Sequence, residues 1–228
     1  MTLLSHIPVP SIHLNLIATL AAVTWQLARN RAEDEDAALV KRLREGDEEA
    51  FLALVGRYQA SMLRLARSFV PSAAVAEEVV QDTWIGVLRG IDGFAGRSSF
   101  KTWLLRILVN RAKTTGVRED RSIAIGDAGP AVDSARFDAS GAWMAPPQHW
   151  IEDSHDRLLA ESMADEIRDA LEELPGRQRE VVLLRDVDGL TSEEVCDVLD
   201  ISEGNQRVLL HRGRSRLRQV LESELGGA

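Results

Sequence analysis

Apolar residues recur every three or four positions from Glu35 to about Arg118, and no run of strict apolar and polar alternation there is long enough for a strand. This spacing predicts a first domain made only of helices. Helical spacing resumes after Asp156 on a stripe of apolar residues that stops at Pro175-Gly176, where a helix cannot easily continue. The pattern therefore predicts a second all-α domain that runs to the C-terminus.

The segment between the two helical stretches has a different composition, rich in Gly, Ala, Ser, Asp and Pro. Gly126, Gly129 and Pro130 break any regular element near its start, and Pro146-Pro147 do so near its end. The sequence thus predicts an all-α fold class, with two small helical domains joined by a flexible linker. The expected divisions are an N-terminal extension 1–32, a first domain 33–118, a linker 119–155 and a second domain 156–228.

The apolar stretch from Ile7 to Leu27 is a candidate membrane segment by its composition. No lysine or arginine precedes it, His13 and Asn15 interrupt it, and its apolar run is at the short limit for spanning a bilayer. We therefore expect residues 1–32 to form a poorly ordered extension, or to reflect a start codon assigned too far upstream.

Two short helices joined by a compact turn are predicted in the second domain. Thr191-Ser192-Glu193-Glu194 has the sequence of a capping box, which opens the first of these helices. In the turn Asp200–Gly204, Ser202 can cap the next helix, and Gly204 is expected to let the chain enter that helix at close quarters. This arrangement predicts a helix-turn-helix, a motif that binds duplex DNA.

The last helix carries a basic stripe. Successive residues of a helix are about 100° apart around its axis, and this spacing places four basic residues on one face and four leucines broadly opposite them. The basic set is Arg207, His211, Arg214 and Arg218, and the opposing set is Leu209, Leu210, Leu217 and Leu221. The N-terminal end of such a helix lies against base edges in the major groove, where Asn205, Gln206 and Arg207 have suitable side chains. A basic terminal helix can equally be a solvated face.

In the first domain, the helix expected over 77–89 has a buried stripe and an acidic patch on the other side. The buried set is Val80, Trp84, Val87, Leu88 and Ile91, and the patch is Glu78, Gln81 and Asp82. Such a patch faces water or a basic partner. The next helix, from Phe100 to about Thr114, is expected to bury Trp103, Leu104, Ile107 and Leu108. Its polar stripe consists of Thr102, Arg106, Asn110 and Lys113.

The loop between these two helices, residues 92–99, holds Phe94 between glycines, with Arg97 nearby. An aromatic ring beside a cation suits single-stranded nucleic acid, because an unstacked base can lie on the ring while the cation meets the backbone. Phe94 can instead close the top of the core, and Trp103 can be a core residue.

The chemistry of an enzyme is not evident in the chain. One cysteine, Cys196, excludes an internal disulfide framework and a zinc site built on paired cysteines, which fits a reducing, cytoplasmic setting. The five histidines show no ligand spacing, and no nucleophile and base pair or phosphate-binding glycine loop is found. We therefore expect no catalytic residues, no metal, no cofactor and no small-molecule substrate. The formal net charge of −9 is segregated, so that 97–121 and 207–218 remain basic.

Several motifs in order make the chain resemble the extracytoplasmic-function sigma factors of RNA polymerase, in the sigma-70 family. They are Gly46-Asp47-Glu48-Glu49-Ala50-Phe51, Ala76-Glu77-Glu78-Val79-Val80-Gln81-Asp82-Thr83-Trp84, Phe100-Lys101-Thr102-Trp103-Leu104-Leu105-Arg106-Ile107-Leu108-Val109-Asn110-Arg111 and Leu174-Pro175-Gly176-Arg177-Gln178-Arg179-Glu180-Val181, followed by the turn at Asp200. The resemblance implies that the first domain is sigma region 2 and the second is sigma region 4.

The resemblance also implies roles for individual residues. Core polymerase would be bound by Glu78, Gln81 and Asp82. The promoter minus-ten element would be held by Phe94, Arg97, Trp103, Arg106, Asn110 and Lys113. The minus-thirty-five element would be bound by Asn205, Gln206, Arg207, His211, Arg212 and Arg214. An anti-sigma factor is a further implied partner, which would hold the protein inactive in the cytoplasm or at the inner face of the membrane.

The chain departs from the family at Val208-Leu209-Leu210, where many relatives have small or basic residues, so base preferences are not carried over. The alternative function is a stand-alone helix-turn-helix transcription regulator whose first domain senses a ligand or dimerises. That alternative accounts only for the C-terminal half of the sequence.

Overall fold

The computed structural model describes residues 12–119 and 167–225, in two compact units that divide within one helix, between Val55 and Gly56. The first unit contains helix α1 (Ile12–Arg44) and the beginning of α2 (Glu48–Arg67). Because α1 is helical from Ile12, the expected boundary near residue 33 is not a boundary of secondary structure. No helix in the described ranges is both long and apolar enough to cross a membrane.

The turn between α1 and α2 is formed by the Gly46-Asp47 pair of the first motif. Gly46 has a φ of 85°, which a residue without a Cβ adopts at no steric cost, and its N–H donates to the Leu43 carbonyl at 3.0 Å. The Asp47 carboxylate accepts from the Ala50 N–H at 3.2 Å and lies 2.7 Å from the Arg42 guanidinium. These bonds hold the pKa of Asp47 below its usual range. The motif therefore ends one helix and caps the next.

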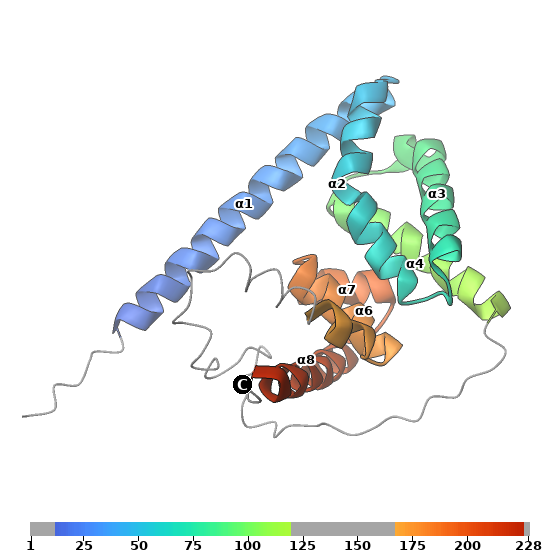
Figure 1. Cartoon of the computed structure of the whole chain (residues 1–228). Helices are drawn as coiled ribbons and strands as arrows, with labels where there is room; N and C mark the ends of the chain where they lie inside the picture. Colours follow the sequence, from blue (N-terminus) through green and yellow to red (C-terminus); the bar gives the residue numbers. More distant parts are fainter. Residues whose placement is uncertain (1–11, 120–166, 226–228) are drawn as a thin grey trace, which may run out of the picture. The chain divides into compact units, whose positions relative to one another are not determined.

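The second unit begins with the remainder of α2, followed by α3 (Ala73–Gly90), the short 3₁₀ turn η1 (Ile91–Gly93) and α4 (Phe100–Glu119). We call these elements the N-terminal helix group. Helices α3 and α4 pack against each other (Figure 1). The buried side chains of this group include Met62, Leu65, Val80, Trp84, Val87, Leu104, Leu105 and Leu108. The Trp84 indole N–H donates to Gln59 Oε1 at 3.0 Å, which satisfies its one polar atom inside this core.

The second unit continues with α6 (Gly176–Val182), a π-helical turn η4 (Leu183–Val187), α7 (Ser192–Leu199) and α8 (Glu203–Leu225). We call these the C-terminal helix group. The predicted capping box at Thr191 is present, with Thr191 Oγ1 accepting from the Glu194 N–H and Glu194 accepting from the Thr191 N–H. Ser202 Oγ accepts from the Asn205 N–H at 3.3 Å at the start of α8. The helix-turn-helix predicted from the sequence is therefore formed by α7 and α8.

The turn between α7 and α8 differs from the prediction in one detail. The residue that reverses the chain is Asp200, which has a φ of 58° and ends α7. Gly204 has no neighbouring atom within 4 Å of the position its Cβ would occupy, so close entry into α8 does not require glycine there. Close packing falls instead on Gly213, where a Cβ would lie 2.6 Å from Val182 Cγ2 and 3.4 Å from the Gln178 carbonyl.

The predicted all-α fold class is confirmed, with no strand in the described ranges. The predicted linker falls outside those ranges apart from Glu119, as do residues 156–166 of the expected second domain. Ala170 and Leu174, from the apolar stripe that precedes Pro175, are both buried. The helical periodicity of the sequence therefore located the core of both helix groups.

Candidate nucleic-acid interface

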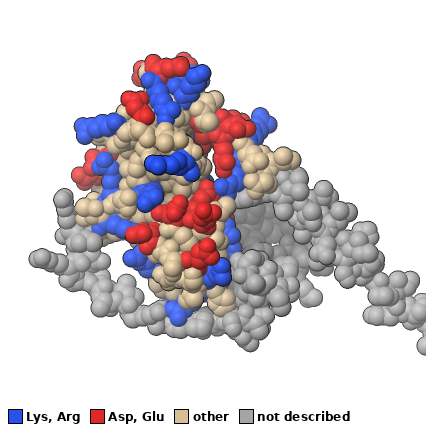
Figure 2. Space-filling model, turned by 180° about the vertical axis from the view of Figure 1, so that it is seen from behind, with Lys and Arg blue, Asp and Glu red and all other residues tan. Residues whose placement is uncertain are grey.

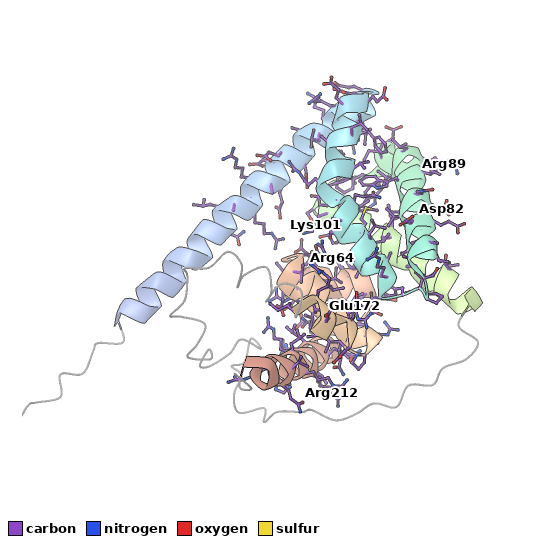
Figure 3. The ribbon with its side chains drawn as sticks, in the orientation of Figure 1. Arg64, Asp82, Arg89, Lys101, Glu172 and Arg212 are labelled. Atoms are coloured by element: carbon purple, nitrogen blue, oxygen red, sulfur yellow. The ribbon has the colours of Figure 1, made fainter. Side chains whose placement is uncertain are left out.

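The outer face of α3 carries the acidic patch expected to bind polymerase. Glu78, Gln81 and Asp82 are all exposed, and Figure 3 shows Asp82 and Arg89 projecting from this face. Ile85 is 45% exposed and Leu88 is 47% exposed. Leu88 was expected on the buried stripe, and that assignment was wrong because the helix turns it toward solvent. The face is therefore a mixed acidic and apolar surface.

A hollow of about 560 Å³ lies between α3 and α4. Its lining brings Glu78 and Asp82 of the acidic patch together with Asn110 of the α4 polar stripe. Arg111 NH1 lies 3.6 Å from Asp82 Oδ2, and a Cβ on Gly86 would lie 2.7 Å from Arg111 NH2. The absence of a side chain at Gly86 thus leaves room for Arg111 to lie along α3 and join the two helices.

Phe94 belongs to an aromatic cluster at the edge of the core. Its ring centroid is 4.9 Å from that of Trp103 and 6.0 Å from that of Phe100, which in turn lies 5.9 Å from that of Tyr58. Phe100 is buried, whereas Phe94 and Trp103 are half-buried. Both interpretations of these residues thus fit the geometry, because the rings close the core and retain exposed surface. Arg97 is exposed in the same loop.

The polar stripe of α4 is only partly open to solvent. Arg106 and Asn110 are exposed, Lys113 is half-buried, and Thr102 is 2% exposed. Lys113 Nζ donates to the Leu199 carbonyl at the end of α7, at 2.6 Å. Burial lowers the pKa of Lys113, and the charge of Arg177 lowers it further, while Glu180 and Asp200 act in the opposite direction.

The residues at the N-terminal end of α8 that were predicted to contact DNA differ in their exposure. Asn205 and Arg207 are exposed, and Arg207 NH2 lies 2.9 Å from Glu203 Oε2. Gln206 is 1% exposed, and neither polar atom of its side chain has a hydrogen-bond partner among the described residues. Gln206 therefore does not face the groove that Asn205 and Arg207 would meet, because it lies on the packed face of α8 with Leu210.

Farther along α8, His211 and Arg212 are half-buried, and Figure 3 shows Arg212 pointing away from the helix group. Arg214 is held by Asp186 of η4, with Nε 2.9 Å from Oδ2 and NH2 2.7 Å from Oδ1. Only 16% of the Arg214 side chain is exposed. The structure thus ties Arg214 into the C-terminal helix group, although the sequence placed it on the same stripe as Arg207.

Glu180 of α6 was not singled out as a site residue from the sequence, since nothing in its local pattern distinguishes it from a solvated carboxylate. It is 4% exposed, and its Oε2 lies 3.6 Å from Arg177 NH1. Burial raises its pKa to about 7, although the charges of Arg177, Lys113 and Arg179 act to lower it. Of these cations, Lys113 belongs to α4, so the environment of Glu180 includes a residue of the N-terminal helix group.

On one face of the molecule, basic and acidic side chains of the described residues are interspersed. Figure 2 shows Lys and Arg side chains close to Asp and Glu side chains across one face, rather than one broad basic field. Within the described ranges, no group of three or more His, Cys, Asp or Glu is placed to hold a metal ion. Arg106 on α4 and Arg207 on α8 are exposed cations among the residues expected to contact DNA.

Comparison with protein families gives two matches along the chain. Residues 54–122 match the model described as Sigma-70 region 2, and residues 164–217 match the model described as Sigma-70, region 4. The first match covers the N-terminal helix group, and the second covers the C-terminal helix group as far as residue 217 in α8. Each exposed polar stripe described above therefore lies inside one of the matched regions.

Individual proteins give the same result. The chain is 35% identical over 182 residues to a protein of Escherichia coli (strain K12) named ECF RNA polymerase sigma-E factor, with 80% of this chain and 92% of that protein covered. It is 30% identical over 190 residues to the RNA polymerase sigma-H factor of Pseudomonas aeruginosa, with coverage of 83% and 95%. A solved structure described as CnrH in complex with the cytosolic domain of CnrY is similar in fold, with a TM-score of 0.53, 22% identity and coverage of 83% and 99%.

Proposed function

This chain belongs to the extracytoplasmic-function RNA polymerase sigma factors of the sigma-70 family, and from that membership we propose that it binds core RNA polymerase and directs promoter-specific initiation. The strongest support is that both region matches fall on helix groups with exposed polar stripes. A stand-alone helix-turn-helix regulator is not favoured, because it leaves the region 2 match over 54–122 without a role.

Polymerase docking is assigned to the outer face of α3. Its exposed carboxylates at Glu78 and Asp82 suit a basic partner surface, and Gln81 adds an amide that both donates and accepts. The exposed Ile85 and Leu88 supply the apolar area that charged groups alone do not provide. We assign residues 33–118 to the domain that carries this surface and the minus-ten contacts.

Melted minus-ten DNA is assigned to the loop at Phe94 and to the α4 stripe. The half-buried rings of Phe94 and Trp103 offer faces on which an extruded base can stack, and Arg97, Arg106 and Lys113 supply cations for the phosphates. Asn110 can form two hydrogen bonds to a base edge. Extruding a base costs a few kcal/mol, which stacking and polymerase binding must offset together.

The minus-thirty-five element is assigned to the exposed N-terminal end of α8 in the domain 156–228. Asn205 and Arg207 are exposed there, and an Arg guanidinium can bond two acceptors of one guanine. His211 and Arg212 lie one turn farther along and suit phosphate contacts. Gln206 and Arg214 are placed in supporting roles, because the first is buried and the second is paired with Asp186.

Catalysis belongs to the polymerase in this proposal, so the chain is a specificity subunit and not an enzyme in its own right. The site of action is the cytoplasm, where polymerase and promoter DNA are found. An anti-sigma factor is proposed as a further partner, on family membership, and would act by covering the α3 and α4 surfaces.

The test is promoter-dependent transcription with purified core polymerase on a template from upstream of the protein's own gene. We expect specific initiation that requires the chain and that falls in both Asn110→Ala and Arg207→Ala. Exposed Arg31→Ala, on α1, is the matched control and should retain wild-type initiation. Absence of core binding, together with a shift of duplex DNA by the chain alone, would replace this proposal with the regulator.

A further inference from the structure

Val208 is an exposed apolar side chain near the N-terminal end of α8, the part of the helix assigned to promoter DNA. It is 48% exposed, whereas Leu210, two positions later, is only 2% exposed and Leu209 between them is half-buried. Within this run of three apolar residues, Val208 is therefore the one that remains available to a partner.

The fold gives no reason for a valine at this position. The packed face of α8 is supplied by Gln206, Leu210 and Gly213, which are all buried. Valine is also a weaker helix former than alanine or arginine, because its branched Cβ restricts the side chain against the preceding turn. An exposed valine inside a helix thus lowers helix stability slightly, while other residues fill the core. A contact with a partner accounts for its presence.

Val208 shares one side of α8 with two polar residues. Asn205 precedes it by three positions and Arg212 follows it by four, and residues at these spacings are neighbours on a helix surface. Asn205 is exposed, and Arg212 points away from the helix group (Figure 3). The preceding residue, Arg207, is also exposed, and its NH2 group lies 2.9 Å from Glu203 Oε2. Val208 therefore lies among the side chains that would meet base edges in the major groove.

We propose that Val208 recognises the C5-methyl group of a thymine in the minus-thirty-five element. Base edges in the major groove present hydrogen-bond donors and acceptors, and the thymine methyl is the apolar group among them. A valine side chain forms no hydrogen bond, so a polar base edge placed against it would lose water without a replacement. Its two methyl groups are held in one preferred rotamer in a helix, which fixes where the contact falls. The proposal rests on the proposed sigma function and adds a base preference, which the family match leaves open.

Deoxyuridine tests this contact directly, because it differs from thymidine only by the missing methyl group and still pairs with adenine. Binding of the chain with core polymerase is measured on synthetic duplexes that carry the promoter from upstream of its own gene. Each minus-thirty-five thymine, on either strand, is replaced in turn by deoxyuridine. The duplexes contain no 5-methylcytosine, so thymine is the source of any methyl effect. We expect one replacement to raise the Kd of the complex about threefold to fivefold, as the loss of one buried methyl group predicts.

Val208→Ser should remove that difference, so that the thymine and deoxyuridine duplexes bind equally well. Val187→Ser is the matched control, because Val187 is 47% exposed and belongs to η4 rather than to α8. The same chemical change at Val187 should leave the ratio of the two Kd values as it is in the wild type.

Two results would overturn the assignment of Val208. One is equal binding of every duplex by the wild type, and the other is an undiminished ratio in Val208→Ser, which would give the methyl contact to another residue. Failure of the sigma function is visible separately, because the wild-type complex would then bind the unmodified promoter no better than a scrambled duplex. In that case the assignment of Val208 fails together with the function on which it rests.

Discussion

Arg214 of α8 and Asp186 of η4 form an ion pair with two hydrogen bonds, of 2.9 and 2.7 Å, one to each carboxylate oxygen. The forked geometry and partial burial make such a pair stronger than a single exposed contact. It joins the last helix to the π-helical turn that precedes α7. Arg214, which the sequence placed on a DNA-binding stripe, therefore stabilises the packing of the helix-turn-helix.

We expect Arg214→Ala and Asp186→Ala each to lower the free energy of unfolding by about 1 kcal/mol, because each removes the same pair. Arg207→Ala should leave stability nearly unchanged and weaken promoter binding. Urea denaturation followed by circular dichroism measures the first effect, and promoter binding by the polymerase complex measures the second. Equal stability of wild type and Asp186→Ala would show that the pair contributes nothing.

The buried carboxyl of Glu180 should make stability depend on pH. Its pKa is about 7 in the folded protein and near 4.5 when the chain is unfolded. The folded state therefore binds more protons between these values, and its stability falls as the pH rises from about 4.5 to 7. The full effect of this difference is about 3 kcal/mol.

Glu180→Gln removes this titration, so the variant should be more stable than wild type at pH 8 and similar to it near pH 5. Chemical denaturation at pH 5, 6, 7 and 8 measures the difference. Glu193→Gln makes the same chemical change at an exposed carboxyl of α7 and should not alter the pH profile. A constant difference between Glu180→Gln and wild type at all four pH values would rule out titration of Glu180 in this range.

The sequence predicted the features that depend on neighbouring residues. The capping box at Thr191, the cap at Ser202 and the helical core stripes with Val80 and Leu104 follow from local spacing, and all are present. The exposure of Leu88 did not follow, because it lies at the edge of its helical stripe, where a small rotation decides which way it faces. The burial of Gln206 agrees with the helical spacing, which puts it among the leucines of α8, and its expected DNA contact rested on its amide group alone.

Contacts between the two helix groups also could not be predicted from the sequence. Nothing in the pattern around Asp188 indicates that Ser61 would donate to it, since 127 positions separate them. The partner of Lys113 was not predictable either. Its spacing indicates membership of a basic stripe on α4, but its ammonium group donates to a carbonyl of α7. Such pairings depend on how helices pack in three dimensions, which residue types at local spacing do not specify.

Gly213 should be intolerant of a side chain. A Cβ there would lie 2.6 Å from Val182 Cγ2 and near the Gln178 carbonyl, so α6 and α8 would have to separate. We expect Gly213→Ala to lower the free energy of unfolding by about 1–3 kcal/mol through overpacking. Gly204→Ala is the control on the same helix, since its Cβ position is open and alanine favours a helix by up to about 1 kcal/mol. Thermal unfolding of both variants should therefore shift in opposite directions.

Ile85 should contribute to polymerase binding without contributing to the fold. It is 45% exposed on the α3 face between the carboxylate of Asp82 and the exposed Leu88, and solvated apolar groups inside a charged patch are typical of protein contact surfaces. We expect Ile85→Asp to weaken binding to core polymerase about tenfold, equivalent to about 1.4 kcal/mol, with little change in unfolding.

Leu27→Asp is the matched control for Ile85, because Leu27 is a 62% exposed apolar residue on α1 and is not a member of the acidic patch. Fluorescence anisotropy of the labelled chain against core polymerase measures both variants. Equal loss of affinity in the two would indicate a general effect of added negative charge. Loss confined to Ile85→Asp, with unchanged unfolding, would instead place the contact on α3, because only that variant alters the face that Glu78 and Asp82 share.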